Sequence, residues 1–420
     1  MNKLRVGIVV FEEFNPTDGG AYSYQELLLK SINEFQFHPK IEIVNIIFYK
    51  NRKNEVSEFK KESIYIKRGV GGSLRDSVKH STIKYLNLQI TRRNPLVNFL
   101  SAYVLKKRNL KAEEILRENK IDLIYYLRTE WEVLNYPFIA THWDNCHKSI
   151  PPFPEVALDG MYEKRERYHL YTLNKALAIL CESNAGAAEV RRLNCYDETK
   201  IKVLPIFAGD VINKKFTPEE QQKTLLKYKL EKEKFFLYPA QFWAHKNHYN
   251  LILAFNKFIK ENSDDKLKLV LCGSDKGNLA YIKEVITFLS LNDRVLVPGF
   301  ISVEELNHLY TNALALTMST FLGPTNMPLI EAAHLICPVL CSNLSGHKEI
   351  LGDNAIYFSP ADADSIKDAM NKILDESLRK KLKASAFIHI QQSHFNVTKA
   401  LKILNEIFCE IIPIRKTWGH

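Results

Sequence analysis

Residues 321–358 read FLGPTNMPLIEAAHLICPVLCSNLSGHKEILGDNAIYF, and this stretch indicates how the second half of the chain is built. A Gly-Pro-Thr-Asn turn leads into a helical segment that carries one acid, Glu331, and a buried apolar run, Cys337–Cys341, follows. A second small turn at residues 345–346 comes before another short apolar run. A turn, a helix and a buried strand in this order are typical of a parallel sheet covered by helices.

The same alternation runs through the rest of the chain, where apolar runs predict buried strands between helical segments. In the first half these runs are Leu4–Phe11, Ile41–Tyr49, Ile121–Leu127, Pro137–Asp144, Leu177–Ser183 and Lys200–Pro205. In the second half they are Phe235–Ala240, Lys266–Gly273, Arg294–Phe300, Ala313–Ser319, Pro338–Ser342 and Ala355–Phe358. Strands that are apolar along their whole length are typical of parallel sheets buried on both faces.

The length of 420 residues predicts two domains, because one hydrophobic core rarely grows to that size. We expect an α/β protein of two Rossmann-like doubly wound parallel-sheet domains that face each other across a cleft. The N-terminal domain is predicted over residues 1–207, a polar linker over 208–232 and the C-terminal domain over 233–395. Residues 396–420 are amphipathic and are predicted to form a helix that packs back on the first domain.

Composition places the chain among ordinary globular proteins, with 46% hydrophobic and 25% charged residues. No run reaches the roughly 18 apolar residues of a membrane span, and the N-terminus resembles a first strand more than a signal peptide. The seven cysteines form no C-x-x-C pair, which favours reduced thiols over disulfides or structural zinc. These features predict a cytoplasmic protein, with the inner face of the membrane as a second location to consider.

The net charge of +10 comes from one region, residues 50–120, with roughly eighteen lysines and arginines against about seven acids. A solvated surface explains this charge, and so does attraction to an anionic membrane or a lipid-phosphate substrate. Nucleic-acid binding is not expected, because the region contains no recognisable nucleic-acid-binding module.

Small and polar residues directly follow several predicted strands, where ligands of such sheets bind. Gly19 and Gly20 follow the first strand and allow close approach of a ligand at a helix start, but they form no G-x-G-x-x-G fingerprint. Lys246 follows the strand that opens the second domain, and such a lysine can meet a diphosphate, although an exposed helix-start lysine is the simpler interpretation. Gln241, His245 and His248 lie in the same loop.

Two acid-containing segments raise the question of a metal. His142, Asp144 and His147 follow a strand of the first domain but have no evident fourth ligand, so a carboxylate–imidazole group that lines a cleft is favoured over zinc. Asp362 and Asp364 form a D-x-D pattern just before a helix, where capping explains them. We therefore expect no metal and no cofactor.

Several segments together resemble the retaining glycosyltransferases of family 4, which have the two-domain GT-B fold. The segments follow the family order and are WDNCHKSIPPFPE, YPAQFWAHKNH, LVLCGSDKGN, VLVPGFISVEELNHLY and GPTNMPLIEA. The chain is most similar to the bacterial branch that builds O-antigen, capsule or other surface polysaccharide, and it is mannosyltransferase-like. The resemblance covers nearly the whole chain and is strongest over residues 137–205 and 238–358.

The resemblance implies a hexose transfer from a nucleotide-diphosphate sugar to a glycan or lipid-linked glycan, with retention of configuration and without metal. Lys246 would neutralise the diphosphate and Glu331 would bind the ribose, while Asp144 and His147 would line the acceptor side. The remaining implied substrate contacts are Gly19, Gly20, Gln241, Phe300, Pro324, Thr325, Asn326 and Met327. GDP-mannose is the first donor to consider, and UDP and dTDP sugars stay open.

Two positions depart from the broader family, which has a glutamate where this chain has Gly323 and an arginine where it has Gln241. The first departure removes a sugar contact and leaves Glu331 as the remaining acid of the pair.

Two other functions fit the same fold. A sugar-nucleotide epimerase would act without an acceptor, and a non-catalytic protein would bind a sugar nucleotide or a polyanion without turnover.

Overall fold

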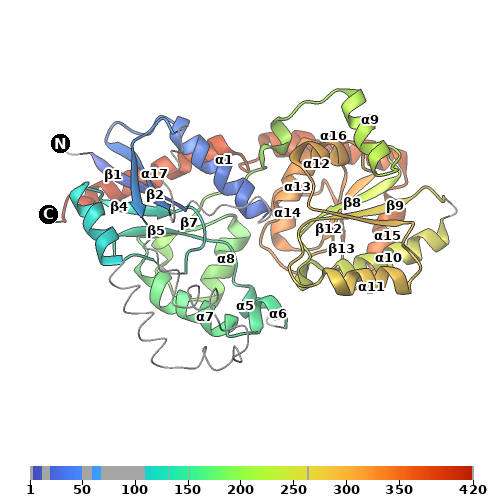
Figure 1. Cartoon of the computed structure of the whole chain (residues 1–420), viewed down its shortest axis with the longest axis horizontal. Coiled ribbons are helices and arrows are strands. Elements are labelled where there is room, and N and C mark those ends of the chain that lie inside the picture. The colour runs from blue at the N-terminus through green and yellow to red at the C-terminus, as the bar shows by residue number, and fades with distance from the viewer. Residues whose placement is uncertain are drawn as a thin grey trace, which may run out of the picture.

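The computed structural model describes residues 3–11, 19–49, 59–67, 109–131, 133–150, 152–262 and 264–418. The chain forms two lobes, each built around one parallel β-sheet with helices on its faces (Figure 1). The predicted α/β class with two doubly wound domains is therefore confirmed. Most of the basic region at residues 50–120 lies outside the described residues, so its predicted membrane contact stays a prediction.

The first sheet has seven strands in the order β3-β2-β1-β4-β5-β6-β7, and all neighbours are parallel. The strands are β1 (Leu4–Phe11), β2 (Ile41–Tyr49), β3 (Ser63–Lys67), β4 (Leu123–Tyr126), β5 (Phe138–His142), β6 (Ala178–Cys181) and β7 (Ile201–Val203). The sequence did not indicate β3, because this edge strand alternates buried and accessible residues and has no continuous apolar run.

Helices cover both faces of the first sheet, and residues 109–118 are helical as well. The named elements are α1 (Gly20–Glu34), α5 (Cys146–Ser149), α6 (Pro154–Ala157), α7 (Met161–Arg167), η2 (Tyr168–Thr172), η3 (Leu173–Lys175), α8 (Asn184–Leu193) and η4 (Glu198–Lys200). The short pieces from α5 to η3 form the connection between β5 and β6, and they place several polar side chains near the carboxyl end of β5.

The second sheet has six parallel strands in the order β10-β9-β8-β11-β12-β13. The strands are β8 (Phe235–Pro239), β9 (Lys268–Cys272), β10 (Val295–Gly299), β11 (Ala315–Met318), β12 (Val339–Ser342) and β13 (Ile356–Phe358). The helices are η6 (Ala244–Lys246), α10 (His248–Glu261), α11 (Leu279–Phe288), α12 (Val303–Asn312), α13 (Met327–His334), α14 (Ser345–Leu351), α15 (Ala363–Lys372) and α16 (Glu376–Gln392).

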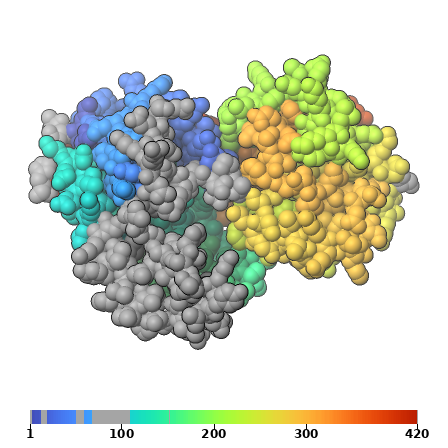
Figure 2. All heavy atoms as spheres, in the orientation of Figure 1, coloured from blue at the N-terminus to red at the C-terminus, as the bar shows by residue number. Residues whose placement is uncertain are grey.

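Residues 208–232, which the sequence predicts as a linker, are folded onto the second domain. They contain η5 (Asp210–Asn213) and α9 (Pro218–Lys227), whose first turn is closed by a capping box between Thr217 and Glu220. Leu225 and Leu230 are buried in the core of the second domain, and α9 lies on that lobe in the space-filling view (Figure 2). The charged residues that indicated a linker are on the exposed side of this helix.

The last helix, α17 (Val397–Arg415), returns to the first domain and lies beside α1 (Figure 1). Phe408 is fully buried there, and its ring contacts those of Phe37 and Tyr125. At the end of the helix Arg415 forms an ion pair with Asp122 at 2.7 Å. The chain therefore crosses between the domains twice.

All seven cysteines are free thiols in the structure. Asp362 caps α15 by accepting from the backbone N–H of Asp364, and Asp364 pairs with Lys257 at 2.7 Å, so the D-x-D pattern is explained by capping. Within the described ranges, no helix is both long and apolar enough to cross a membrane.

Candidate functional site

The loops that follow β8 and β11 meet at the carboxyl edge of the second sheet, because these two strands are neighbours. Lys246 comes from the first loop and Asn326 from the second. The ammonium Nζ of Lys246 donates to Oδ1 of Asn326 at 2.8 Å. Strand order changes direction at this point, and open α/β sheets bind ligands there. The sequence-predicted residues Lys246 and Asn326 are thus brought together across 80 positions of the chain.

Asn326 is held in place by a chain of buried hydrogen bonds. Its Nδ2 donates to Nε2 of His347 at 2.9 Å, and Nδ1 of His347 donates to the carbonyl of Ser342 at 2.8 Å. Since a carbonyl only accepts, Nδ1 carries the proton and Nε2 is free to accept. Burial lowers the pKa of His347 to about 4, which keeps the ring neutral in this role. The orientation of Asn326 is therefore fixed, with its oxygen toward Lys246.

Burial also lowers the pKa of Lys246, to about 8. The side chain still carries a positive charge near neutral pH, but its direct partner is a neutral amide. An ammonium group that is desolvated without a carboxylate in contact favours the binding of an anion. The site can therefore bind a diphosphate through a charge-assisted hydrogen bond.

The Gly-Pro-Thr-Asn turn has a backbone that excludes larger side chains. Gly323 has φ +113°, and a Cβ built there would lie 2.9 Å from the carbonyl oxygen of Thr325 and 3.0 Å from Nδ2 of Asn326. The carbonyl of Pro324 occupies the space that a Cβ on Gly346 would need. The conformation of the turn therefore favours glycine at position 323.

Glu331 lies in α13 with only 6% of its surface exposed. Its Oε2 accepts from the hydroxyl of Tyr310 at 2.8 Å, and its Oε1 accepts from the backbone N–H of Gly209 at 3.3 Å. Burial raises the pKa of the carboxyl, while these two donors favour its ionised form. Each oxygen retains a further lone pair, so the carboxylate can accept hydrogen bonds from a diol.

Asp144 and His147 lie on the first domain but have different partners. Oδ1 of Asp144 accepts from Arg165 at 2.6 Å and from the backbone N–H of Cys146 at 3.0 Å. Arg165 holds the pKa of Asp144 well below its usual range, against the opposing effect of burial. His147 is fully buried and its Nε2 contacts Glu166 at 2.8 Å. The two predicted site residues therefore do not form one carboxylate–imidazole pair.

The other predicted substrate contacts are divided between the two lobes. Gly19 has φ +67° and faces the side chain of Gln241 across the domain boundary, whereas a Cβ on Gly20 would meet open space. Phe300 follows β10 and is 52% exposed. The side chain of Met327 packs in the core of the first domain, so it joins the two domains and leaves its backbone as the group available to a ligand.

Two carboxylates hold the lobes together beside this site. Glu155 of α6 accepts from the backbone N–H of His245 at 2.9 Å and also contacts the Nδ1 atom of that ring. Glu349 of α14 accepts from the first two backbone N–H groups of α8, at 2.9 and 2.7 Å. A carboxylate at a helix N-terminus is favourably placed, so this contact fixes the approach of the two domains.

The sequence did not single out Glu182, an acid that follows β6 and is 6% exposed. Its Oε2 has no hydrogen-bond partner among the described residues, and its pKa is raised well above the usual range by burial. Thr325 lies close enough to interact with it across the domain boundary. The position of Glu182 directly after an apolar strand could have identified it, because a charged residue after such a strand is also what identified Lys246.

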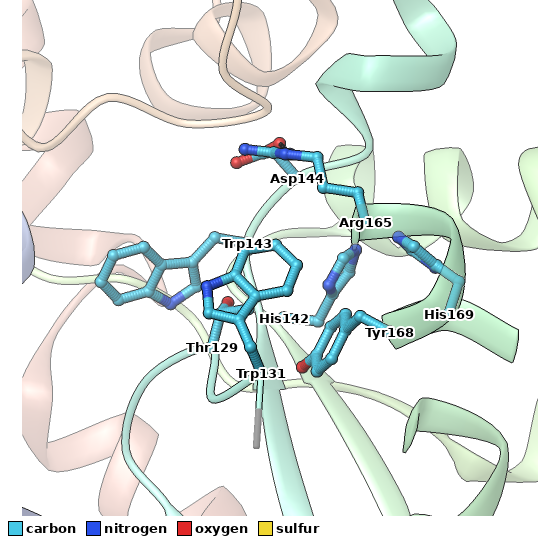
Figure 3. A pocket seen from close by; sticks show the side chains of 8 residues that line it. All are labelled: Thr129, Trp131, His142, Trp143, Asp144, Arg165, Tyr168 and His169. Atoms are coloured by element: carbon cyan, nitrogen blue, oxygen red, sulfur yellow. Dashed lines mark hydrogen bonds and ion pairs between the residues drawn. The ribbon is translucent and has the colours of Figure 1, made fainter. Parts of the chain in front are cut away.

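Figure 3 shows a cavity of about 180 Å³ in the first domain, beside Asp144. Trp131 and Trp143 lie on one side of His142 in this view and His169 lies on the other, while the side chain of Arg165 extends above His142 to Asp144. The complete lining is Thr129, Trp131, His142, Trp143, Asp144, Arg165, Tyr168 and His169. Most of these residues follow β4 or β5, so they also lie at a carboxyl edge.

Residues 219–388, which include Lys246, Asn326 and Glu331, match the family model of the glycosyl transferases group 1. The second domain is a group 1 glycosyltransferase domain. The O-antigen chain mannosyltransferase RfbU of Salmonella typhimurium is 32% identical over 145 residues, which are 34% of this chain and 40% of that protein. The O-antigen chain mannosyltransferase B of Escherichia coli is 23% identical over 273 residues, 61% of this chain and 71% of that protein.

The group 1 domain and the first domain together match a solved structure along nearly their whole length. Anabaena Alr3699/HepE in complex with UDP and glucose has a TM-score of 0.68 and 15% sequence identity, and the match covers 97% of this chain and 100% of that chain. The fold of the chain is therefore GT-B. The alignment with the Salmonella relative spans only two fifths of that protein's length.

The backbone of the Gly323 turn predicts a difference between two glycine substitutions. Gly277 has a similar φ of +105° but an added Cβ there meets nothing within 4 Å. Gly323→Ala should destabilise the protein by about 1–3 kcal/mol and by more than Gly277→Ala, because it adds a clash to the backbone strain. Urea unfolding of the two variants measures this difference. Equal losses would contradict a special role for the turn.

The low pKa of Lys246 predicts opposite effects of pH on diphosphate binding and on stability. Above pH about 8 the side chain loses its ammonium charge, so the affinity of the site for a diphosphate should fall. Between pH 8 and the unfolded value of about 10.4, the unfolded chain binds more protons, so Lys246 makes stability rise with pH. Lys246→Arg should remove the alkaline fall. The same fall in this variant would show that another group titrates.

Proposed function

We propose that the chain transfers a hexose from a nucleotide-diphosphate sugar to a glycan or lipid-linked glycan in surface polysaccharide biosynthesis. The observation that carries this proposal is the cationic Lys246, which Asn326 holds within the group 1 domain and which contacts no carboxylate of the described residues. Two relatives named as O-antigen mannosyltransferases favour GDP-mannose as the donor. The Anabaena structure holds UDP and glucose, so a UDP sugar is the second donor to test.

The proposed reaction retains the configuration of the anomeric carbon. The acceptor hydroxyl attacks the face from which the diphosphate leaves, and the bond between the anomeric carbon and the diphosphate oxygen breaks with its electron pair on that oxygen. The departing oxygen takes the acceptor proton, so no protein nucleophile forms a covalent intermediate. Lys246 stabilises the growing negative charge, and Glu331 holds the ribose hydroxyls.

The two lobes divide the substrates in this scheme. The donor binds mainly to the second domain, and the acceptor binds mainly to the first, where Asp144 is fixed by Arg165. The lobes already touch at Glu155 and Glu349, and their closure over the substrates would exclude water and so favour transfer over hydrolysis. We propose that the reaction needs no metal, because the ammonium group supplies the charge that a metal would otherwise supply. A cytoplasmic location follows from the use of a nucleotide sugar.

Transfer is tested by the release of nucleoside diphosphate from GDP-mannose and from UDP-glucose, each with and without a glycan acceptor and with EDTA present. Release that depends on the acceptor is expected. Lys246→Ala and Glu331→Ala should each lower kcat/KM by about 100-fold or more. Lys257→Ala, which removes an exposed ion pair with Asp364, is the matched control and should have little effect.

Three results would contradict the proposed transfer reaction. Conversion of the sugar without an acceptor would indicate an epimerase, and binding of a sugar nucleotide without turnover would indicate a non-catalytic protein. Full activity of Lys246→Ala and Glu331→Ala would place the donor site elsewhere.

A further inference from the structure

The cavity beside Asp144 contains a buried imidazole that has no hydrogen-bond partner among the described residues. His142 ends β5 with 3% of its surface exposed, and neither ring nitrogen forms a hydrogen bond with the described part of the chain. The Asn145 side chain lies near the ring, but no contact between them meets hydrogen-bond geometry, and Nδ2 of Asn145 is also unpaired. Buried polar groups in proteins are normally satisfied, so these nitrogens indicate a ligand or ordered water in the cavity.

The walls of the cavity combine aromatic faces with polar groups. Trp131 and Trp143 are half-buried and therefore reachable from outside, while His142 and His169 lie deeper (Figure 3). Nε of Arg165 is also buried and has no hydrogen-bond partner in the described ranges. Aromatic walls with a few convergent hydrogen-bonding groups are the usual lining of a small-molecule site.

The polar groups of the cavity have no net charge. Asp144 and Arg165 neutralise each other in an ion pair of 2.6 Å. Burial lowers the pKa of His142 to about 4 and that of His169 to about 2, so both rings are neutral near pH 7. A neutral imidazole has one donor and one acceptor, which matches the hydroxyl of a sugar. Among the described lining residues, a phosphate or a carboxylate would find only the paired Arg165 as a positive charge, and the ammonium of the exposed Lys164 lies over the Trp131 ring, 5.0 Å from its centroid.

The cavity lies close to the loop after β8, which carries Lys246. Asp144 forms part of its wall and also lies close enough to Lys246 and Glu182 to influence their pKa values. A ligand in the cavity would therefore lie on the first-domain side of Asp144, next to the place where the diphosphate is expected.

We propose that this cavity binds a neutral pyranose ring of the acceptor, with Trp131 and Trp143 against its C–H faces and His142 hydrogen-bonded to a hydroxyl. The identification of the ligand as the acceptor rests on the proposed function. The cavity thereby selects a sugar unit of the acceptor, whereas a lipid or phosphate portion must lie outside it.

Direct binding is measured by tryptophan fluorescence with methyl α-D-mannopyranoside, methyl α-D-glucopyranoside and methyl α-D-galactopyranoside as probes. At least one neutral glycoside should quench the emission with an affinity of order millimolar, and glucuronic acid should bind more weakly. Trp131→Phe should reduce the quenching, whereas Trp418→Phe, at the end of the last helix, should not. Absence of quenching by all three neutral glycosides would show that the cavity holds water only.

A second variant separates binding from folding. His142→Leu removes unpaired buried nitrogens and keeps a similar volume, so the thermal midpoint should stay the same or rise. In the transfer assay this variant should raise the KM for the glycoside acceptor about tenfold, the loss of roughly one hydrogen bond, and leave the KM for the donor unchanged. His142→Gln keeps a neutral donor and acceptor and should retain most of the affinity.

The outcomes distinguish this proposal from the proposed function. Glycoside quenching that depends on Trp131 would support the cavity as a sugar site even if no transfer were found. A lower thermal midpoint for His142→Leu with an unchanged acceptor KM would assign His142 a structural role and overturn the proposal. A rise in donor KM would overturn it as well, because the cavity would then hold the donor sugar.

Discussion

A partly buried positive charge, with no carboxylate in contact among the described residues, organises the functional edge of this protein. Lys246 is desolvated, and the group that receives its hydrogen bond is the neutral amide of Asn326. Taking a cation out of water is costly unless an anion compensates for it. The hydrogen bonds from Asn326 through His347 to Ser342 hold this arrangement in place. The site is therefore preorganised for an anionic ligand.

The topology explains why these distant residues meet. In a parallel sheet, loops after adjacent strands lie at one edge, so the loops after β8 and β11 converge although about 80 residues separate them. The first domain repeats this arrangement, and the aromatic cavity follows its β4 and β5. Contacts at Met327, Glu155 and Glu349 then hold the two edges against each other. The fold thus places an anion site opposite a neutral cavity.

The apolar strands were predictable from the sequence, because continuous burial leaves a continuous apolar run such as Leu4–Phe11. β3 was not, since an edge strand needs only alternate apolar residues. Lys246 and Glu331 were identified by their position after strands and by resemblance. The ion pair of Asp144 with Arg165 was not predictable, because it depends on how the short helices after β5 fold back. Whether the ring nitrogens of His142 and Oε2 of Glu182 find hydrogen-bond partners among the described residues likewise depends on tertiary packing, which a local sequence pattern does not indicate.

The central claim is that Lys246 supplies the positive charge for a nucleoside diphosphate. Calorimetric titration with GDP and with UDP at pH 8, in buffers of different ionisation enthalpy, measures the protons taken up on binding. Because burial lowers the pKa of Lys246 to about 8, an anion beside it should raise that value and cause proton uptake. We predict uptake in the wild-type protein and none in Lys246→Arg. Equal uptake in both proteins, or unchanged affinity in Lys246→Met, would contradict the account.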